Sequence, residues 1–220
     1  MIGAGEALRA KIELVLPGYL ATVRAMWDGD AAARYPGYLA MLHTVMRASV
    51  PLLEAALAEC RARADRDPVA GRLAGYYARH AREERGHDEW VRQDLAALGE
   101  DPDGPLAHAP GAAVAGLVGA QYYWLRHYHP CSLLGYIAVV EGYPPSPGWV
   151  GWLRRTTGHP AAAFRTLTRH AELDPGHRDD LYRLLGDLPL TPEQESAIGL
   201  SALHTLRGLI ALLGTGQTGP

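Results

Sequence analysis

Apolar residues recur three or four positions apart along nearly the whole chain, with polar residues between them. No segment alternates apolar and polar residues over the length of a strand, so the pattern predicts helices and no sheet. Turn signals rich in Gly, Pro and Asp separate the helical stretches. Helices are predicted over residues 6–27, 36–64, 69–98, 111–142, 149–156, 160–185 and 191–213, the fourth broken near Pro130.

Several of these helices carry local signals. Pro17 is expected to kink or split the first helix, because a proline inside a helix removes a backbone hydrogen bond. Asp174 before Pro175 is expected to cap a new helical turn, since proline suits the first position of a helix. Thr191 and Gln194 have the spacing of a capping box, which predicts that the last helix starts there.

The helical stretches indicate one domain. No internal repeat is visible, and no linker is long enough to separate two folding units. We therefore expect an all-α fold in which residues 1–213 form a single bundle of seven to eight helices. Residues 214–220 are expected to form a disordered tail.

Composition narrows the classes of function. The 220 residues include 21 Lys and Arg against 24 Asp and Glu, a formal charge of −3 that argues against a nucleic-acid partner. Residues 1–10 lack the apolar core of a signal peptide. The best candidate for a membrane span, 112–141, is interrupted by Arg126 and Pro130, so no span is expected. Two cysteines, Cys60 and Cys131, make no disulfide framework, which favours the cytoplasm.

The third predicted helix carries a cluster of side chains that can bind metal ions. His80, Glu84 and His87 lie at offsets of four and seven, so in a continuous helix they point within a wedge of about 60°. Glu84 and His87 form the Glu-x-x-His pair with which helical bundles hold iron. Carboxylate and imidazole together suit ferrous iron and dioxygen chemistry.

A second triplet has the same spacing. His170, Asp174 and His177 also lie at offsets of four and seven, and a repeated spacing is less expected by chance than a single one. Glu141 follows the apolar run 133–140, where a carboxylate is costly unless it has a partner such as a metal ion. The alternative is that Glu141 simply reaches the surface at the end of its helix.

Four segments carry a resemblance to a known family. They are 83–90 (EERGHDEW), 119–124 (GAQYYW), 134–142 (LGYIAVVEG) and 170–177 (HAELDPGH). With them the chain resembles the haem-oxygenase-like non-haem iron and diiron oxidases, over about residues 38–206. The resemblance implies a haem-oxygenase-like fold of seven helices without haem. It also implies two Fe(II) ions per chain as cofactors and dioxygen as co-substrate.

The same resemblance implies which side chains hold the metal ions. One iron would be held by Glu84, His87 and His177. The second iron would be held by Glu141, His170 and Asp174. His80 occupies a position where members of the family differ, and its place on the face of Glu84 makes it a candidate seventh ligand.

Oxidation of a small molecule by dioxygen is the function that the resemblance implies. Members of the family cleave fatty acids, oxidise or fragment amino acids, form a nitrile or oxygenate nitrogen, so the ligands do not select the substrate. We expect an oxidase or oxygenase that oxidises or cleaves a small amino-acid-derived metabolite in natural-product biosynthesis. A fatty-acid oxidative decarboxylase of the same fold is the alternative. The expected partners are the substrate, an external electron donor and a second copy of the chain in a homodimer.

Two other functions stay open. A thiaminase-like hydrolase of similar fold would use Cys131 as its nucleophile and would need no metal. A non-catalytic protein would bind iron without turnover. The two matched triplets favour a metal enzyme over the hydrolase, whereas only oxygen consumption with a substrate separates an oxidase from a passive iron binder.

Overall fold

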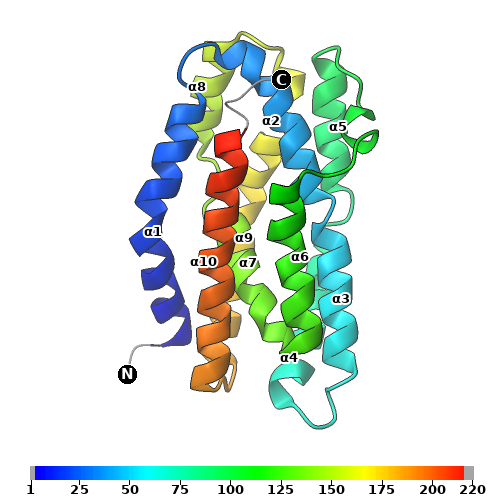
Figure 1. Cartoon of the computed structure of the whole chain (residues 1–220), viewed down its shortest axis with the longest axis vertical. Helices are drawn as coiled ribbons and strands as arrows, with labels where there is room; N and C mark the ends of the chain where they lie inside the picture. The colour runs from blue at the N-terminus through cyan, green and yellow to red at the C-terminus, as the bar shows by residue number, and fades with distance from the viewer. Residues whose placement is uncertain (1–2, 216–220) are drawn as a thin grey trace.

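Helices account for the architecture of the chain. The computed structural model describes residues 3–215, which form a bundle of helices whose axes run mostly along one direction (Figure 1). No strand occurs in this range, so the predicted all-helical fold is confirmed. The α-helices are α1 (Ala4–Met26), α2 (Ala31–Met46), α3 (Ser49–Arg61), α4 (Pro68–Glu83), α5 (His87–Ala97), α6 (Ala112–His127), α7 (Leu133–Val140), α8 (Pro147–Thr157), α9 (Arg165–Asp187) and α10 (Pro192–Thr215). Three short 3₁₀ helices are η1 (Gly104–Leu106), η2 (Pro130–Ser132) and η3 (Ala161–Phe164).

The short helix α7 lies in the middle of the bundle, where all but one of its residues are buried. Helix α10 packs against α7 on one side and against α1 on the other (Figure 1). Gly135 permits the first of these contacts, because a Cβ atom at this position would lie 2.1 Å from the carbonyl oxygen of Ile198. The close packing of α7 fixes the position of Glu141, which directly follows it.

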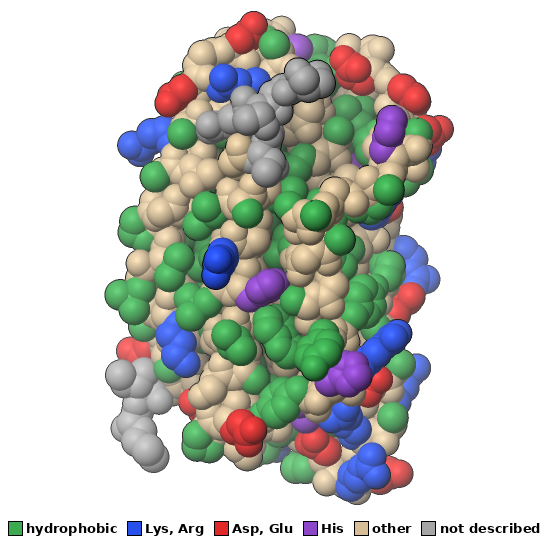
Figure 2. Space-filling model, in the orientation of Figure 1, with side chains coloured by type: hydrophobic (Ala, Val, Ile, Leu, Met, Phe, Trp, Pro, Cys, Tyr) green, Lys and Arg blue, Asp and Glu red, His purple; other side chains and the backbone are tan. Residues whose placement is uncertain are grey.

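Helix α10 is long and apolar enough, by length and composition, to cross a membrane. The expectation that 112–141 is the best candidate for a span is therefore wrong. In the structure α10 is a core helix, in which Ile198, Ala202 and Leu206 are buried. Its outer face carries exposed apolar side chains such as Leu200, and apolar side chains occupy much of the molecular face that α10 and α6 form (Figure 2).

Two of the long predicted helices are each divided in two. The range 36–64 contains α2 and α3, which are separated at residues 47 and 48. The range 69–98 contains α4 and α5, which are separated at residues 84–86. Gly86 adopts φ 90° there, a conformation that glycine reaches without strain. The sequence pattern predicted one continuous helix for His80, Glu84 and His87. This prediction is wrong, because the break separates His80 in α4 from His87 in α5.

The other local predictions have mixed outcomes. The break near Pro130 is confirmed, since α6 ends at His127 and α7 begins at Leu133. Neither Pro17 nor Pro175 divides its helix, since α1 and α9 each continue through the proline despite the lost backbone hydrogen bond. Asp174 consequently lies inside α9 and caps nothing.

The last helix begins as predicted. Thr191 N–H donates to Gln194 Oε1 at 2.9 Å, and Gln194 N–H donates to Thr191 Oγ1 at 3.2 Å, which together form the capping box. Helix α10 continues to Thr215, two residues beyond its expected end at residue 213. The rest of the expected tail, 216–220, lies outside the described residues.

Candidate metal centre

The seven candidate ligands come from three places in the bundle and meet in its interior. The first place is the end of α4 and the start of α5, the second is the end of α7, and the third is the middle of α9. The side chains brought together are His80, Glu84, His87, Glu141, His170, Asp174 and His177. Glu141 is 8% exposed, so it does not simply reach the surface at the helix end.

Four of these side chains form a first cluster with metal-binding geometry. The ligand atoms of His80, Glu84, Glu141 and His177 all lie within 4.8 Å of one another. His80 Nε2 is 2.9 Å from Glu141 Oε1, and His177 Nδ1 is 3.3 Å from Glu141 Oε2. Glu141 therefore stands between the two imidazole rings.

A second cluster adjoins the first. The ligand atoms of Glu84, His87 and His170 lie within 4.8 Å of one another, and His87 Nδ1 is 3.2 Å from Glu84 Oε1. Glu84 is common to both clusters. A carboxylate has two oxygen atoms and can contact two cations at once, so the arrangement suits a pair of metal ions that share Glu84.

The structure groups the side chains differently from the resemblance. His177 lies with Glu141 and His80, whereas His170 lies with Glu84 and His87. The reason is position along α9, because His170 and His177 are about two helical turns apart and so reach different ends of the centre. Asp174 lies between them, with Oδ1 3.9 Å from His177 Nδ1, and belongs to neither cluster at the 4.8 Å limit.

Unpaired polar atoms supply a test of whether these residues fit metal ions. Buried polar atoms in proteins normally have hydrogen-bond partners, because burying them without one is costly. Within residues 3–215, buried atoms without a hydrogen-bond partner are concentrated at this centre. They include Glu84 Oε1, His87 Nδ1, Glu141 Oε2, Asp174 Oδ1 and His177 Nδ1. Oxygen and nitrogen atoms of this kind suit iron or manganese, so the residues fit the metal pair.

The charges at the centre are strongly coupled. Burial alone would raise the pKa of Glu141, but His80 and His177 beside it lower that pKa to about 2. Contact with Glu141 raises the pKa of His177 to about 9. Burial and the nearby Glu141 and Glu84 carboxylates raise the pKa of Asp174 to about 8. Three carboxyl groups in one buried space repel one another, and bound cations would relieve that repulsion.

Neighbouring residues orient the ligand side chains. His170 Nδ1–H donates to the carbonyl oxygen of Thr166 at 2.8 Å, which leaves Nε2 of this ring for a metal ion. The ring of Trp90 stacks on His87 at 4.0 Å, and the ring of Tyr76 stacks on His80 at 5.4 Å. Sequence reasoning did not identify these supports, although Tyr76 lies four residues before His80 and so shares its helix face.

A cavity of about 170 Å³ adjoins the centre. Four candidate ligands reach it: Glu84, Glu141, His170 and Asp174. The rest of its wall is mostly apolar or aromatic and includes Met41, Val139, Tyr136, Leu167, Leu209 and Leu213. A small molecule in this cavity would lie directly beside the bound metal ions.

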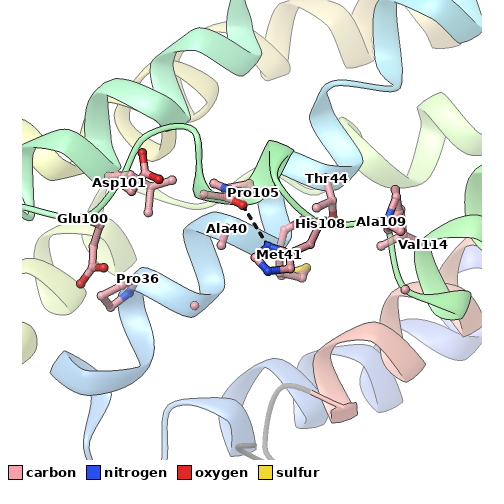
Figure 3. Close-up of a pocket in the computed structure, with 15 residues that line it drawn as sticks. Pro36, Ala40, Met41, Thr44, Glu100, Asp101, Pro105, His108, Ala109 and Val114 are labelled. Atoms are coloured by element: carbon pink, nitrogen blue, oxygen red, sulfur yellow. Dashed lines mark hydrogen bonds between the residues drawn. The ribbon is translucent and has the colours of Figure 1, made fainter.

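A separate groove of about 470 Å³ lies on the surface between α2 and the segment 100–111. Pro36, Ala40 and Thr44 line one side of it, and Pro105 and His108 line the other (Figure 3). No candidate metal ligand lines this groove. We therefore place the chemistry in the smaller internal cavity.

Cys131, the candidate nucleophile of the hydrolase alternative, lies outside that cavity. It is a free, fully buried thiol, and burial raises its pKa. The nearest imidazole is occupied on both sides, since His129 Nδ1 accepts the backbone N–H of Cys131 and His129 Nε2 lies 2.7 Å from Asp67 Oδ2. The described residues thus give Cys131 no base that would activate it.

The described residues form an all-helical bundle with two adjoining His and carboxylate clusters that could hold metal ions. The sequence profile of a family described as iron-containing redox enzymes matches residues 37–208. The chain belongs to this family.

Solved structures agree with the fold. A domain of unknown function with a heme oxygenase-like fold from Shewanella denitrificans has a TM-score of 0.81 at 18% identity, over 96% of this chain and 90% of that chain. A TenA homolog from Pseudomonas syringae pv. tomato has a TM-score of 0.72 at 13% identity, over 95% and 91% of the two chains. These likenesses establish the haem-oxygenase-like fold. No curated protein matches the chain.

Proposed function

We propose that the protein is a non-haem diiron oxygenase or oxidase that acts on a small amino-acid-derived metabolite. The observation that carries the proposal is the sharing of Glu84 by two adjoining clusters of ligand atoms. Membership of an iron-containing redox family supports iron as the metal. A ferrous pair, when bound, supplies electrons for the reduction of dioxygen.

The residues of the chain hold and shield this chemistry. His80, Glu141 and His177 hold one side of the centre, His87 and His170 hold the other, and Glu84 joins the two. The hydrogen bond from His170 Nδ1 to Thr166 sets the direction in which that ring presents Nε2. The apolar walls of the cavity keep water away from the substrate and so protect a reactive oxidant from side reactions.

The size of the cavity supports a small substrate. Its volume of about 170 Å³ is below the roughly 300–1,000 Å³ typical of drug-sized ligands. A long-chain fatty acid would need a longer channel, so the cavity favours the amino-acid-derived class over the fatty-acid alternative. We further propose the cytoplasm as its location, because both cysteines are free and buried.

The proposal is tested by loading the protein with ferrous iron without oxygen and then exposing it to oxygen. Oxygen consumption and stopped-flow absorbance are followed across a panel of amino acids, their amines and short fatty acids. We expect about two irons per chain and a substrate that accelerates oxygen consumption. Binding of iron with no substrate-dependent oxygen consumption across the panel would support the passive iron binder instead. Formation of a hydrolysis product by the metal-free protein, without oxygen consumption, would support the hydrolase.

A further inference from the structure

Besides the candidate metal ligands and Thr166, the wall of the internal cavity contains one residue with a buried polar atom that has no hydrogen-bond partner among the described residues. Tyr136 belongs to α7, is 3% exposed and lines the cavity. Its hydroxyl is buried and has no hydrogen-bond partner within the described residues. A buried hydroxyl normally has a partner, because leaving it unpaired costs about 1–3 kcal/mol.

The place of this hydroxyl relates it to the metal centre. The Tyr136 phenol lines the same cavity as Glu84 and Glu141, and their charges add to burial in raising its pKa. The phenol therefore stays neutral and keeps its proton as a donor. The second buried phenol without a partner, Tyr76, stacks on His80 and does not line the cavity. Among the tyrosines that line the cavity, Tyr136 is thus the one whose buried hydroxyl has no partner within the described residues.

The other lining residues limit the chemistry of such a molecule. Among the described residues no Lys or Arg lines the cavity, and the carboxylates that line it are candidate metal ligands. A substrate carboxylate would therefore find no Lys or Arg partner there, and the imidazole of His170 is a candidate metal ligand. The remaining wall suits an apolar body.

We propose that the Tyr136 hydroxyl is a hydrogen-bond donor to the substrate, and that the substrate has a small apolar body with an uncharged oxygen or nitrogen acceptor. This inference rests on the proposed function, because it assigns the substrate to the same cavity. It deepens that function by naming a residue that positions the substrate beside the metal pair. Substrates that carry a carbonyl, hydroxyl or amide in place of a free carboxylate fit this site best.

The test uses metal-free protein and two probes of equal shape, cyclohexanone and methylenecyclohexane, which differ in one acceptor oxygen. Their dissociation constants are measured by NMR titration for the wild type, Tyr136→Phe and Tyr143→Phe. Tyr143 lines the same cavity but is partly exposed, so water can serve its hydroxyl. We expect Tyr136→Phe to reduce the preference for cyclohexanone about fivefold to tenfold and Tyr143→Phe to change it less than about twofold.

Thermal unfolding of the same metal-free variants gives a second readout. Removing an unpaired buried hydroxyl relieves its desolvation cost, so Tyr136→Phe should raise Tm by about 2–4 °C. A lower Tm would mean that the hydroxyl has a partner inside the protein, which overturns the proposal. An unchanged probe preference, or a wild type that binds neither probe, overturns it as well.

The outcome for Tyr136 is separable from the outcome for the metal centre. Failure to bind iron, with the probe preference as expected, would overturn the proposed function and leave the cavity and Tyr136 as a ligand site. Two irons per chain with substrate-dependent oxygen consumption, but no effect of Tyr136→Phe on probe preference, would overturn only the role of Tyr136.

Discussion

The carboxylate of Asp94 in α5 accepts the backbone N–H of Thr166, in the first turn of α9, at 2.9 Å. It also accepts the N–H of Arg165 at 3.0 Å, so a residue of one helix caps the start of another. Helix α5 begins with His87, and Thr166 in turn holds the ring of His170. The Asp94 cap therefore fixes the two helices whose histidines form the second ligand cluster.

Replacing Asp94 is expected to weaken both the fold and that cluster. Asp94→Ala removes the acceptor of two backbone N–H groups, of which that of Thr166 is buried, so it should cost about 2 kcal/mol of stability and lower Tm by about 4–8 °C. Thermal unfolding followed by circular dichroism measures the shift. Asp65→Ala is the control, because Asp65 is exposed. Equal Tm values for the two variants would show that the cap contributes no stability.

The shared position of Glu84 leads to a prediction about metal content. Glu84→Gln should lower the binding of both ions, because Glu84 contributes to both clusters. His170→Ala and His177→Ala should each leave about one ion per chain, since each histidine belongs to one cluster. Metal analysis after anaerobic ferrous loading measures the three stoichiometries.

The number of ions that each variant loses distinguishes the ligand grouping in the structure from the grouping that the resemblance implies. Glu84→Gln should not lower the Tm of the metal-free protein, because it removes one of several buried carboxylates that repel one another. A Glu84→Gln variant that keeps one full-affinity ion would show that Glu84 serves a single metal, as the resemblance implies. If Glu84→Gln retains two ions per chain, Glu84 is not a metal ligand.

The sequence predicted the helices well because helical periodicity is a local property. The capping box at Thr191 and the break near Pro130 depend on neighbouring residues and are confirmed. The break at Gly86 was missed because glycine within an apolar periodic stretch does not show which backbone conformation it adopts. Pro175 led to the opposite error, because a proline signals a helix start but α9 continues through it.

The candidate ligands could be found from sequence, but their grouping could not. Equal spacing within 80–87 and within 170–177 identified two sets of side chains, and the structure brings both sets into one buried space. Which side chain of one set lies beside which side chain of the other depends on how the helices pack. The spacing along a single helix carries no information about that packing. Asp94 and Tyr136 were missed for the same reason, because their roles depend on distant segments. The role of the seven side chains as ligands, the partners and the location stay predictions.

The thiols give a prediction that tests the hydrolase alternative. Cys60 and Cys131 are fully buried, and burial raises the pKa of both thiols, that of Cys60 to about 12. Iodoacetamide reacts with thiolates, so the folded protein at pH 8 should resist alkylation while the denatured protein takes up two labels. Mass spectrometry counts the labels. Rapid labelling of native Cys131, or loss of turnover in Cys131→Ser with normal iron content, would favour the hydrolase.

The protonation of the metal-free centre predicts how metal affinity depends on pH. His177 has a pKa of about 9 and Asp174 a pKa of about 8, so both groups carry protons at pH 7. A ligand must lose its proton to bind a metal ion, so metal binding at pH 7 should release protons. Affinity should rise from pH 6 to 9, by up to about tenfold per pH unit for each proton displaced. Glu141 adds no proton to this release, because its pKa of about 2 keeps it ionised.

Calorimetric titration with Mn(II), which avoids oxidation, measures the protons released by comparing buffers of different ionisation enthalpy. His177→Ala should release one proton fewer than the wild type if His177 is a ligand. His170→Ala is the matched control, because burial lowers the pKa of His170 and the ring is already neutral at pH 7. If Mn(II) binds the wild type at pH 7 without proton release, neither His177 nor Asp174 ligates the metal. If His177→Ala and the wild type release the same number of protons, His177 is not a ligand. The first cluster would then consist of His80, Glu84 and Glu141.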